Sequence, residues 1–246
     1  MRALFLQEIS PYPVAFLDYR RRSSIMELLP WERYWQEKAE LDFMRDDPDE
    51  ANHPIRVRMG KEAERVGGKV LDVGCGTAID YPRLRDLGFE YWAVEPIPKF
   101  IDRALDLYPE LYLFIRQARV WDIPFEDDTF DVVWCKGVVQ HLPPGTYPEA
   151  LEELWRVTKT LLMVSTNRVF LSSPGITHRL KEGPFDNHYN FKEFYGHVKR
   201  LPNSVSRHIK GFLKPDELEE AKKAGRIHTL FLIYNRKYWR EHHEAG

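Results

Sequence analysis

Residues 70–78 constrain the fold of this chain more than any other segment. They read Val-Leu-Asp-Val-Gly-Cys-Gly-Thr-Ala, an apolar run that leads directly into a turn with two glycines. A short apolar run before such a turn is typical of a buried strand. Glycine at positions 74 and 76 lets the backbone approach a ligand where a side chain would block it. The segment therefore predicts a strand, a ligand-binding turn and a helix.

Strand and helix signals alternate after this segment. Strands are predicted at 69–73, 91–94, 113–117, 130–136 and 161–166, with helices at 81–87, 98–108 and 147–157. A helix at 190–201 and strands at 205–212 and 228–235 complete the pattern. Such alternation favours an α/β fold with a Rossmann-like, mostly parallel seven-stranded sheet and helices on both faces. Open sheets of this kind bind ligands at the carboxyl ends of their strands.

A nicotinamide-dependent dehydrogenase is the first function to consider, because enzymes of this class have a glycine turn after the first strand of the sheet. The dinucleotide fingerprint requires a glycine three residues after the second glycine, where the helix packs closely against the strand. That position is Ile79. The fingerprint is incomplete, which disfavours hydride transfer.

The segments after four of the predicted strands resemble class I S-adenosylmethionine-dependent methyltransferases, particularly the group that includes quinone-biosynthesis and related small-molecule enzymes. The resemblance covers about residues 68–167 and implies S-adenosyl-L-methionine as cofactor, with S-adenosyl-L-homocysteine as product. The cofactor-binding residues that it implies are Asp72, Gly74, Cys75, Gly76, Thr77, Glu95, Pro96, Val120, Trp121, Asp122, Lys136 and Gly137.

Glu95 ends the second predicted strand, where the family has an acid that binds both ribose hydroxyls. A carboxylate offers two acceptor oxygens, which suit a pair of neighbouring hydroxyls. Two positions depart from the family pattern. Ala78 stands where many members have a third glycine, and Arg119 stands where many have an acid close to the adenine amino group. Trp121 has packing as an equal alternative to adenine contact.

The sequence pattern and the extent of the resemblance together predict the domain organisation. We expect residues 1–66 to form an N-terminal helical extension or cap, and residues 67–246 to form the methyltransferase domain, with an acceptor-side insertion near 168–200. The extension is expected to hold a helix within 23–51, which places Trp31, Tyr34 and Trp35 on one side, and a second helix at 54–66.

Two histidines are the candidate catalytic residues. Methyl transfer needs mainly alignment and exclusion of water, so a base matters only when the acceptor loses a proton. His141 follows the fourth predicted strand, and His188 lies in a polar and aromatic loop at 183–190. Pocket lining or packing is the alternative role for His141, and capping of the next helix by Asn190 explains part of the pattern around His188. No cysteine and histidine spacing indicates a metal site.

Charge and composition bear on the partners. Residues 168–246 carry 15 Lys and Arg against 9 Asp and Glu, whereas the whole chain carries 36 against 38. This asymmetry keeps RNA or tRNA open as an alternative to the expected small-molecule acceptor, and a non-catalytic cofactor-binding partner protein is a third hypothesis. The chain has two cysteines, and we find no signal peptide and no apolar run of membrane-spanning length. We expect a soluble, cytoplasmic monomer or homodimer.

Overall fold

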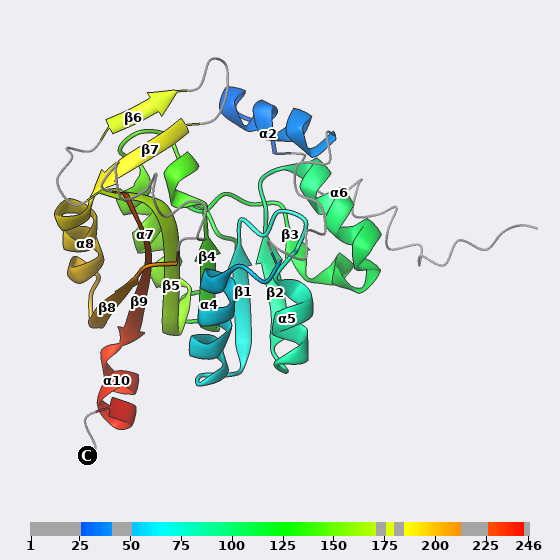
Figure 1. Ribbon diagram of the computed structural model, residues 1–246. Coiled ribbons are helices and arrows are strands. Elements are labelled where there is room, and N and C mark those ends of the chain that lie inside the picture. Colours follow the sequence, from blue (N-terminus) through cyan, green and yellow to red (C-terminus); the bar gives the residue numbers. More distant parts are fainter. Residues whose placement is uncertain (1–25, 41–50, 171–175, 180–184, 213–225, 244–246) are drawn as a thin grey trace, which may run out of the picture.

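The computed structural model describes residues 26–40, 51–170, 176–179, 185–212 and 226–243, and its centre is one twisted sheet (Figure 1). Five parallel strands stand in the order β3-β2-β1-β4-β5. They are β1 (Lys69–Val73), β2 (Glu90–Val94), β3 (Ile115–Arg116), β4 (Phe130–Lys136) and β5 (Thr158–Phe170). This arrangement confirms the predicted Rossmann-like class, and it brings the carboxyl ends of β1, β2 and β4 side by side.

Antiparallel pairing extends the sheet beyond β5. The last long strand, β9 (Arg226–Asn235), runs antiparallel to β5 and to β8 (Ser204–Lys210). A hairpin of β6 (Ile176–Arg179) and β7 (Phe185–Asn190) joins the far end of β5, where Val169 pairs with Tyr189. The seven expected strands are thus present, and the hairpin adds two more.

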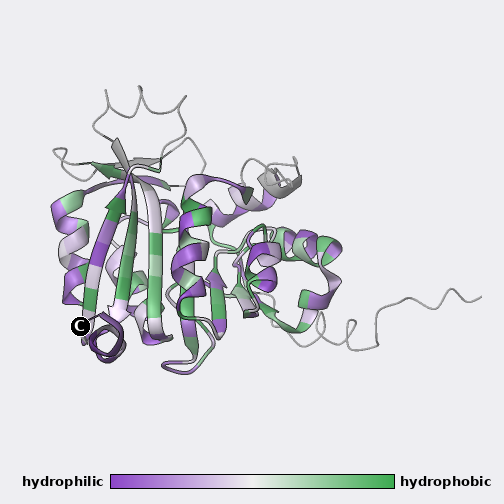
Figure 2. Ribbon diagram, turned by 60° about the horizontal axis from the view of Figure 1, so that its bottom comes forward, coloured by the Kyte–Doolittle hydropathy of each residue, from purple (hydrophilic) through white to green (hydrophobic). Residues whose placement is uncertain are grey.

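Both faces of the sheet are covered by helices. One face packs against α4 (Pro54–Glu64), α5 (Tyr81–Asp86) and α6 (Pro98–Leu107). The other face packs against α7 (Tyr147–Arg156) and α8 (Phe191–Arg200). Strands covered on both faces are apolar along their whole length, and Val132 to Cys135 of β4 are all fully buried. Figure 2 shows hydrophobic residues along the strands, whereas α10 (Arg236–His243) is mostly hydrophilic.

Three predictions of local structure were wrong. The third strand is only two residues long, because Pro109 begins a 3-10 helix, η1 (Pro109–Leu113), over its expected start. No strand was predicted between residues 167 and 204, but the end of β5 and all of β6 lie there, and most of the polar and aromatic loop predicted at 183–190 is strand β7. Polar side chains there hid the strand pattern, and pairing with β5 and β9 stabilises it.

The predicted N-terminal helix is present as α2 (Pro30–Glu40), which lies over the carboxyl edge of the sheet in Figure 1. Residues 23–25 and 41–50 of the expected span lie outside the described residues. The second helix, α4, packs directly against the sheet through Ile55, Met59 and Ala63. Within the described ranges, no helix has the length and hydrophobicity needed to cross a membrane.

Candidate active site

A cavity of about 660 Å³ opens at the carboxyl ends of β1, β2 and β4. Most of the residues predicted from the sequence line it, namely Gly74, Cys75, Gly76, Thr77, Glu95, Pro96, Val120, Trp121, Lys136, Gly137 and His141. Three predicted residues do not: Asp72, Asp122 and His188. The fold therefore gathers four separate segments of the chain around one space.

The turn after β1 has the backbone conformation that its glycines predict. Gly74 and Gly76 have φ angles of 69° and 57°, in the left-handed region that side chains disfavour. A Cβ on Gly74 would also collide with the Val138 side chain. Ala78, at the position of the missing third glycine, has φ 58° and so adopts the same conformation at a cost in strain.

Glu95 is held at the end of β2 by the turn itself. Its carboxylate accepts hydrogen bonds from the backbone N–H groups of Gly76, at 2.9 Å, and Ile97, at 3.1 Å. Burial raises the pKa of Glu95 to about 7, although both of these hydrogen bonds oppose the shift. One donor on each oxygen leaves further acceptor capacity on both, as the binding of two hydroxyls requires.

Asp72 lies beneath the glycine turn in a buried polar network. It accepts a hydrogen bond from the Tyr91 hydroxyl at 2.9 Å, and burial together with nearby Asp80 raises its pKa to about 8. Asp80 in turn pairs with Arg56 and accepts a hydrogen bond from Trp134 Nε1. Asp72 thus supports the turn from below, whereas the sequence predicted that it binds the cofactor.

Arg56 is a cavity residue that the sequence analysis missed. It projects from α4 into the lining of the cavity and is only 5% exposed. Its sequence neighbours show an ordinary amphipathic helix, so no local signal marks it. Only the packing of α4 against the sheet carries its guanidinium to the site.

The segment between β3 and β4 forms a second wall through Arg119, Val120 and Trp121. Arg119 forms a bidentate pair with Glu32 of α2, in which both nitrogen–oxygen distances are 2.8 Å. Glu32 is fully buried, so this pair fastens α2 over the cavity. Asp122, one of the predicted cofactor-binding residues, is exposed and lies outside the cavity lining.

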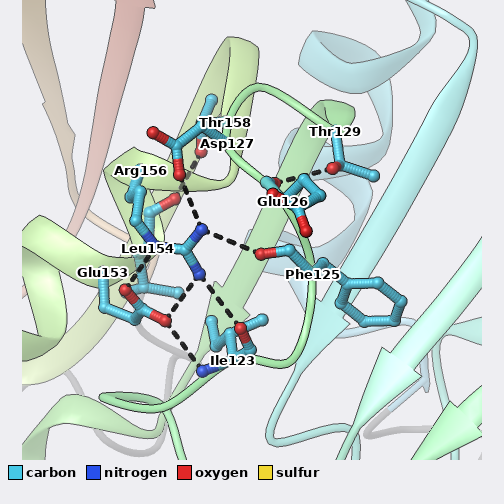
Figure 3. Close-up of polar contacts among 9 residues, drawn as sticks. All are labelled: Ile123, Phe125, Glu126, Asp127, Thr129, Glu153, Leu154, Arg156 and Thr158. Carbon is cyan, nitrogen blue, oxygen red and sulfur yellow. Dashed lines mark hydrogen bonds and ion pairs between the residues drawn. The ribbon is translucent and has the colours of Figure 1, made fainter.

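Arg156 of α7 holds the other half of this segment, as Figure 3 shows. Its guanidinium donates to the carbonyl oxygens of Ile123 and Phe125 and to the carboxylates of Asp127 and Glu153. Glu153 also accepts from the backbone N–H of Ile123 at 2.8 Å. The segment from Ile123 to Asp127 is therefore anchored to α7.

Aromatic rings of α2 line a further part of the cavity, which we call the aromatic end. Trp31 and Trp35 of α2 line it, with the Trp31 ring centroid 6.4 Å from Trp121 and 6.2 Å from Phe185 of β7. The Trp35 ring lies edge-on to His141 at 5.1 Å. This end is built from elements far apart in the sequence.

His141 ends the short 3-10 turn η2 (Val139–His141) and lines the cavity. Its Nδ1 lies 2.9 Å from the carbonyl oxygen of Phe185. A carbonyl can only accept, so Nδ1 carries the proton in the neutral ring and Nε2 holds the lone pair. His188 instead lies 3.3 Å from Asp186 and packs on Phe170. Among the described residues, no three His, Cys, Asp or Glu side chains form a metal site.

Comparison with known proteins agrees with this geometry. A family model described as a methyltransferase domain matches residues 71–161. The ubiquinone biosynthesis O-methyltransferase of Xanthomonas campestris pv. campestris is 28% identical over 181 residues, 70% of each chain. An uncharacterized protein of Methanocaldococcus jannaschii is 33% identical over 104 residues, 40% of this chain and 41% of its own.

This chain is a class I S-adenosylmethionine-dependent methyltransferase.

Solved structures share the fold of this methyltransferase. The 1,6-didemethyltoxoflavin-N1-methyltransferase of Burkholderia thailandensis has a TM-score of 0.60 at 14% identity, covering 85% of this chain and 91% of its own. A SAM-dependent methyltransferase of Aquifex aeolicus has a TM-score of 0.54 at 18% identity, covering 84% and 99%. The cofactor is S-adenosylmethionine, and the left-handed glycines with the buried Glu95 carboxylate fit it.

Proposed function

We propose that this methyltransferase acts on a small molecule with an aromatic ring and an O–H or N–H group at the methylated atom. The observation that carries this proposal is the aromatic end of the cavity, where Trp31 and Trp35 line the cavity together with His141. Flat apolar rings favour a flat, apolar partner. The names of two of the similar proteins, an O-methyltransferase and an N1-methyltransferase crystallised with 1,6-didemethyltoxoflavin, support this class of acceptor.

The cofactor end has a matching group for each part of the cofactor. Glu95 accepts the ribose hydroxyls, the turn from Gly74 to Thr77 faces the methionine part, and Arg56 provides a positive charge for its carboxylate. Val120 and Trp121 provide the wall for the adenine ring. Bound S-adenosylmethionine supplies a methyl group on a positively charged sulfur, so the donor needs no further activation by the protein.

His141 is the group that takes the proton of the acceptor. The hydrogen bond to Phe185 places the proton of the neutral ring on Nδ1, and Nε2 can then accept a proton from a hydroxyl or an amine. The tryptophans of α2 exclude water from this end, which keeps the alignment that the transfer depends on. His188, the other predicted base, lies outside the cavity lining.

A label-transfer experiment tests the class of acceptor. The pure enzyme is incubated with methyl-labelled S-adenosylmethionine and a cell extract, and the products are passed through a small-molecule filter. We expect label in the filtrate before any digestion. Label retained by the filter and released only by nuclease would support RNA as the acceptor, and cofactor binding without any label transfer would support a non-catalytic partner protein.

Paired histidine variants test the base. The assay uses the small-molecule filtrate of a cell extract as the acceptor. We expect His141→Gln to lower kcat for methyl transfer to this acceptor by roughly 10²- to 10⁴-fold, the usual contribution of a general base. Its affinity for S-adenosylhomocysteine should change little. His188→Gln should lower kcat far less, because this side chain lies outside the cavity lining. Equal losses in the two variants would contradict the assignment of His141.

A further inference from the structure

We propose that Gln140 is a specificity-determining residue whose side-chain carbonyl accepts a hydrogen bond from the methyl acceptor. The acceptor would then carry a second N–H or O–H group close to the atom that is methylated. This inference rests on the proposed function, because it places the acceptor at the aromatic end of the cavity. It identifies a part of the acceptor that the aromatic rings cannot recognise.

The side chain of Gln140 places a buried polar atom beside the cavity. Gln140 lines the cavity and is only 7% exposed. Its Oε1 has no hydrogen-bond partner among the described residues. Leaving such a carbonyl unpaired destabilises a folded protein, so buried amide groups are normally satisfied. A cavity-lining carbonyl of this kind is explained when a ligand supplies the missing donor.

The position of Gln140 indicates which ligand supplies the donor. Gln140 precedes His141 in η2, and β7 packs against this turn. The Tyr189 hydroxyl donates to the carbonyl of Val139 at 2.6 Å, and the Asn187 amide donates to the carbonyl of Leu142 at 2.7 Å. These two hydrogen bonds join η2 and the residue after it to β7, the strand that begins at Phe185.

The groups proposed for the cofactor lie on other elements. Glu95 ends β2, Arg56 projects from α4, and Gly74 to Thr77 follow β1. Gln140 and His141 are instead neighbours on one turn and both line the cavity, and the His141 ring contacts Trp35. Oε1 of Gln140 and Nε2 of His141 are both acceptors, and they can therefore bind two donor groups of one molecule. His141 takes the proton from the methylated atom, and Gln140 orients the ring through the second donor.

Two substitutions at this position separate hydrogen bonding from volume. Gln140→Met keeps the length of the side chain and removes the carbonyl, whereas Gln140→Glu keeps an acceptor oxygen at the same place. The probe is the small-molecule filtrate of a cell extract with methyl-labelled S-adenosylmethionine. For Gln140→Met we expect the apparent KM for the filtrate to rise about tenfold or more, with S-adenosylhomocysteine affinity within about twofold of wild type. Gln140→Glu should recover part of the loss.

Thermal unfolding of the ligand-free protein adds a readout that needs no acceptor. Gln140→Met should raise the Tm, because it removes an unpaired buried carbonyl. Gln117→Met is the matched control, since the Gln117 amide donates to the carbonyl of Pro96 at 3.1 Å. The same substitution there should lower the Tm, because it breaks a bond that exists.

Several results would overturn the proposal. A lowered Tm in Gln140→Met would mean that the carbonyl has a partner in the protein, and a large loss of S-adenosylhomocysteine affinity would assign Gln140 to the cofactor. An unchanged apparent KM would show that Gln140 accepts no hydrogen bond from the methyl acceptor. These outcomes differ from failure of the proposed function, in which the wild-type enzyme itself transfers no label to the filtrate.

Discussion

At the scale of single residues, the glycine turn shows how a backbone conformation limits the sequence. Gly74 faces two separate restrictions, a φ angle of 69° and the close approach of Val138. Gly145 has a similar φ of 81° but open space where a Cβ would lie. The two glycines therefore form a matched pair that separates backbone strain from collision.

We expect Gly74→Ala to lower the free energy of unfolding by about 2–4 kcal/mol, the sum of left-handed strain and overpacking. Gly145→Ala should cost only about 1–2 kcal/mol, from strain alone. Adding Val138→Ala to Gly74→Ala should recover part of the difference. Urea unfolding followed by tryptophan fluorescence measures all three, and equal losses at the two glycines would refute the collision.

Glu95 should make cofactor binding depend on pH. Burial raises its pKa to about 7, and the ribose hydroxyls donate best to the ionised carboxylate. As the pH falls below 7 the protonated form gains, so S-adenosylhomocysteine affinity should fall by up to about tenfold per pH unit. Titration of the quenching of cavity tryptophans measures the affinity. Glu95→Gln should bind more weakly and without this pH dependence, and a wild-type affinity that is flat from pH 5.5 to 8 would count against the ionised form.

At the scale of elements, α2 lies over the site and is not one of the helices that cover the two faces of the sheet. It is held by the Glu32–Arg119 pair and by Gln36, whose side-chain oxygen accepts from the backbone N–H of Lys99 at 3.3 Å. Glu32 also accepts from the backbone N–H of Leu29 at 2.7 Å, which caps its own helix. The Glu32 carboxylate thus both caps α2 and forms the ion pair that holds this helix over the cavity.

We expect Glu32→Gln to lower the opening free energy of α2 by about 1–3 kcal/mol, because a bidentate charged pair loses one of its partners. Hydrogen exchange of the amides in residues 30–40 reports this change, and S-adenosylhomocysteine should dissociate faster. Glu37→Gln, an exposed change in the same helix, is the control. Unchanged exchange in Glu32→Gln would show that packing of the tryptophans alone holds α2.

At the scale of the whole molecule, the methyltransferase keeps ionisable groups inside its core beneath the active site. Asp72, Asp80 and Arg56 lie together at the junction of α4 with the strand ends, and Asp80 Oδ1 has no hydrogen-bond partner among the described residues. Burying carboxylates in this way costs stability whenever they ionise. The arrangement gives up some stability to hold Arg56 at the cavity.

Asp72 gives this cost a defined pH dependence. Its folded pKa, about 8, is above its unfolded value, so its contribution to stability is complete below the unfolded pKa and is lost as the pH rises through 8. Asp72→Asn keeps an acceptor for Tyr91 and cannot ionise. We expect this variant to raise the Tm more at pH 9 than at pH 5.5, at about 2–4 °C for each kcal/mol. A Tm difference that is the same at both pH values would exclude an ionising Asp72.

Local features of the chain were enough to predict the centre of the fold and most of the segments that line the cavity. Apolar runs and the glycine turn are short-range signals, and they specified β1, β4, the left-handed turn and the place of Glu95 at the end of β2. The strands of the β6–β7 hairpin lack such a signal. Their pairing with each other and with β5 decides them.

Long-range contact decided the remainder of the site. Arg119 meets Glu32 across 87 positions of the chain, and Arg56 meets Asp80 across 24. Packing turned Asp72 and Asp122 away from the cavity lining and left the Gln140 carbonyl unpaired. Side-chain partners depend on which elements pack together, and a sequence pattern reports only which face of its own element is buried. Hence the strand ends and the turn that line the cavity could be predicted from the sequence, whereas the side-chain partners of Arg56 and Arg119 required the tertiary structure.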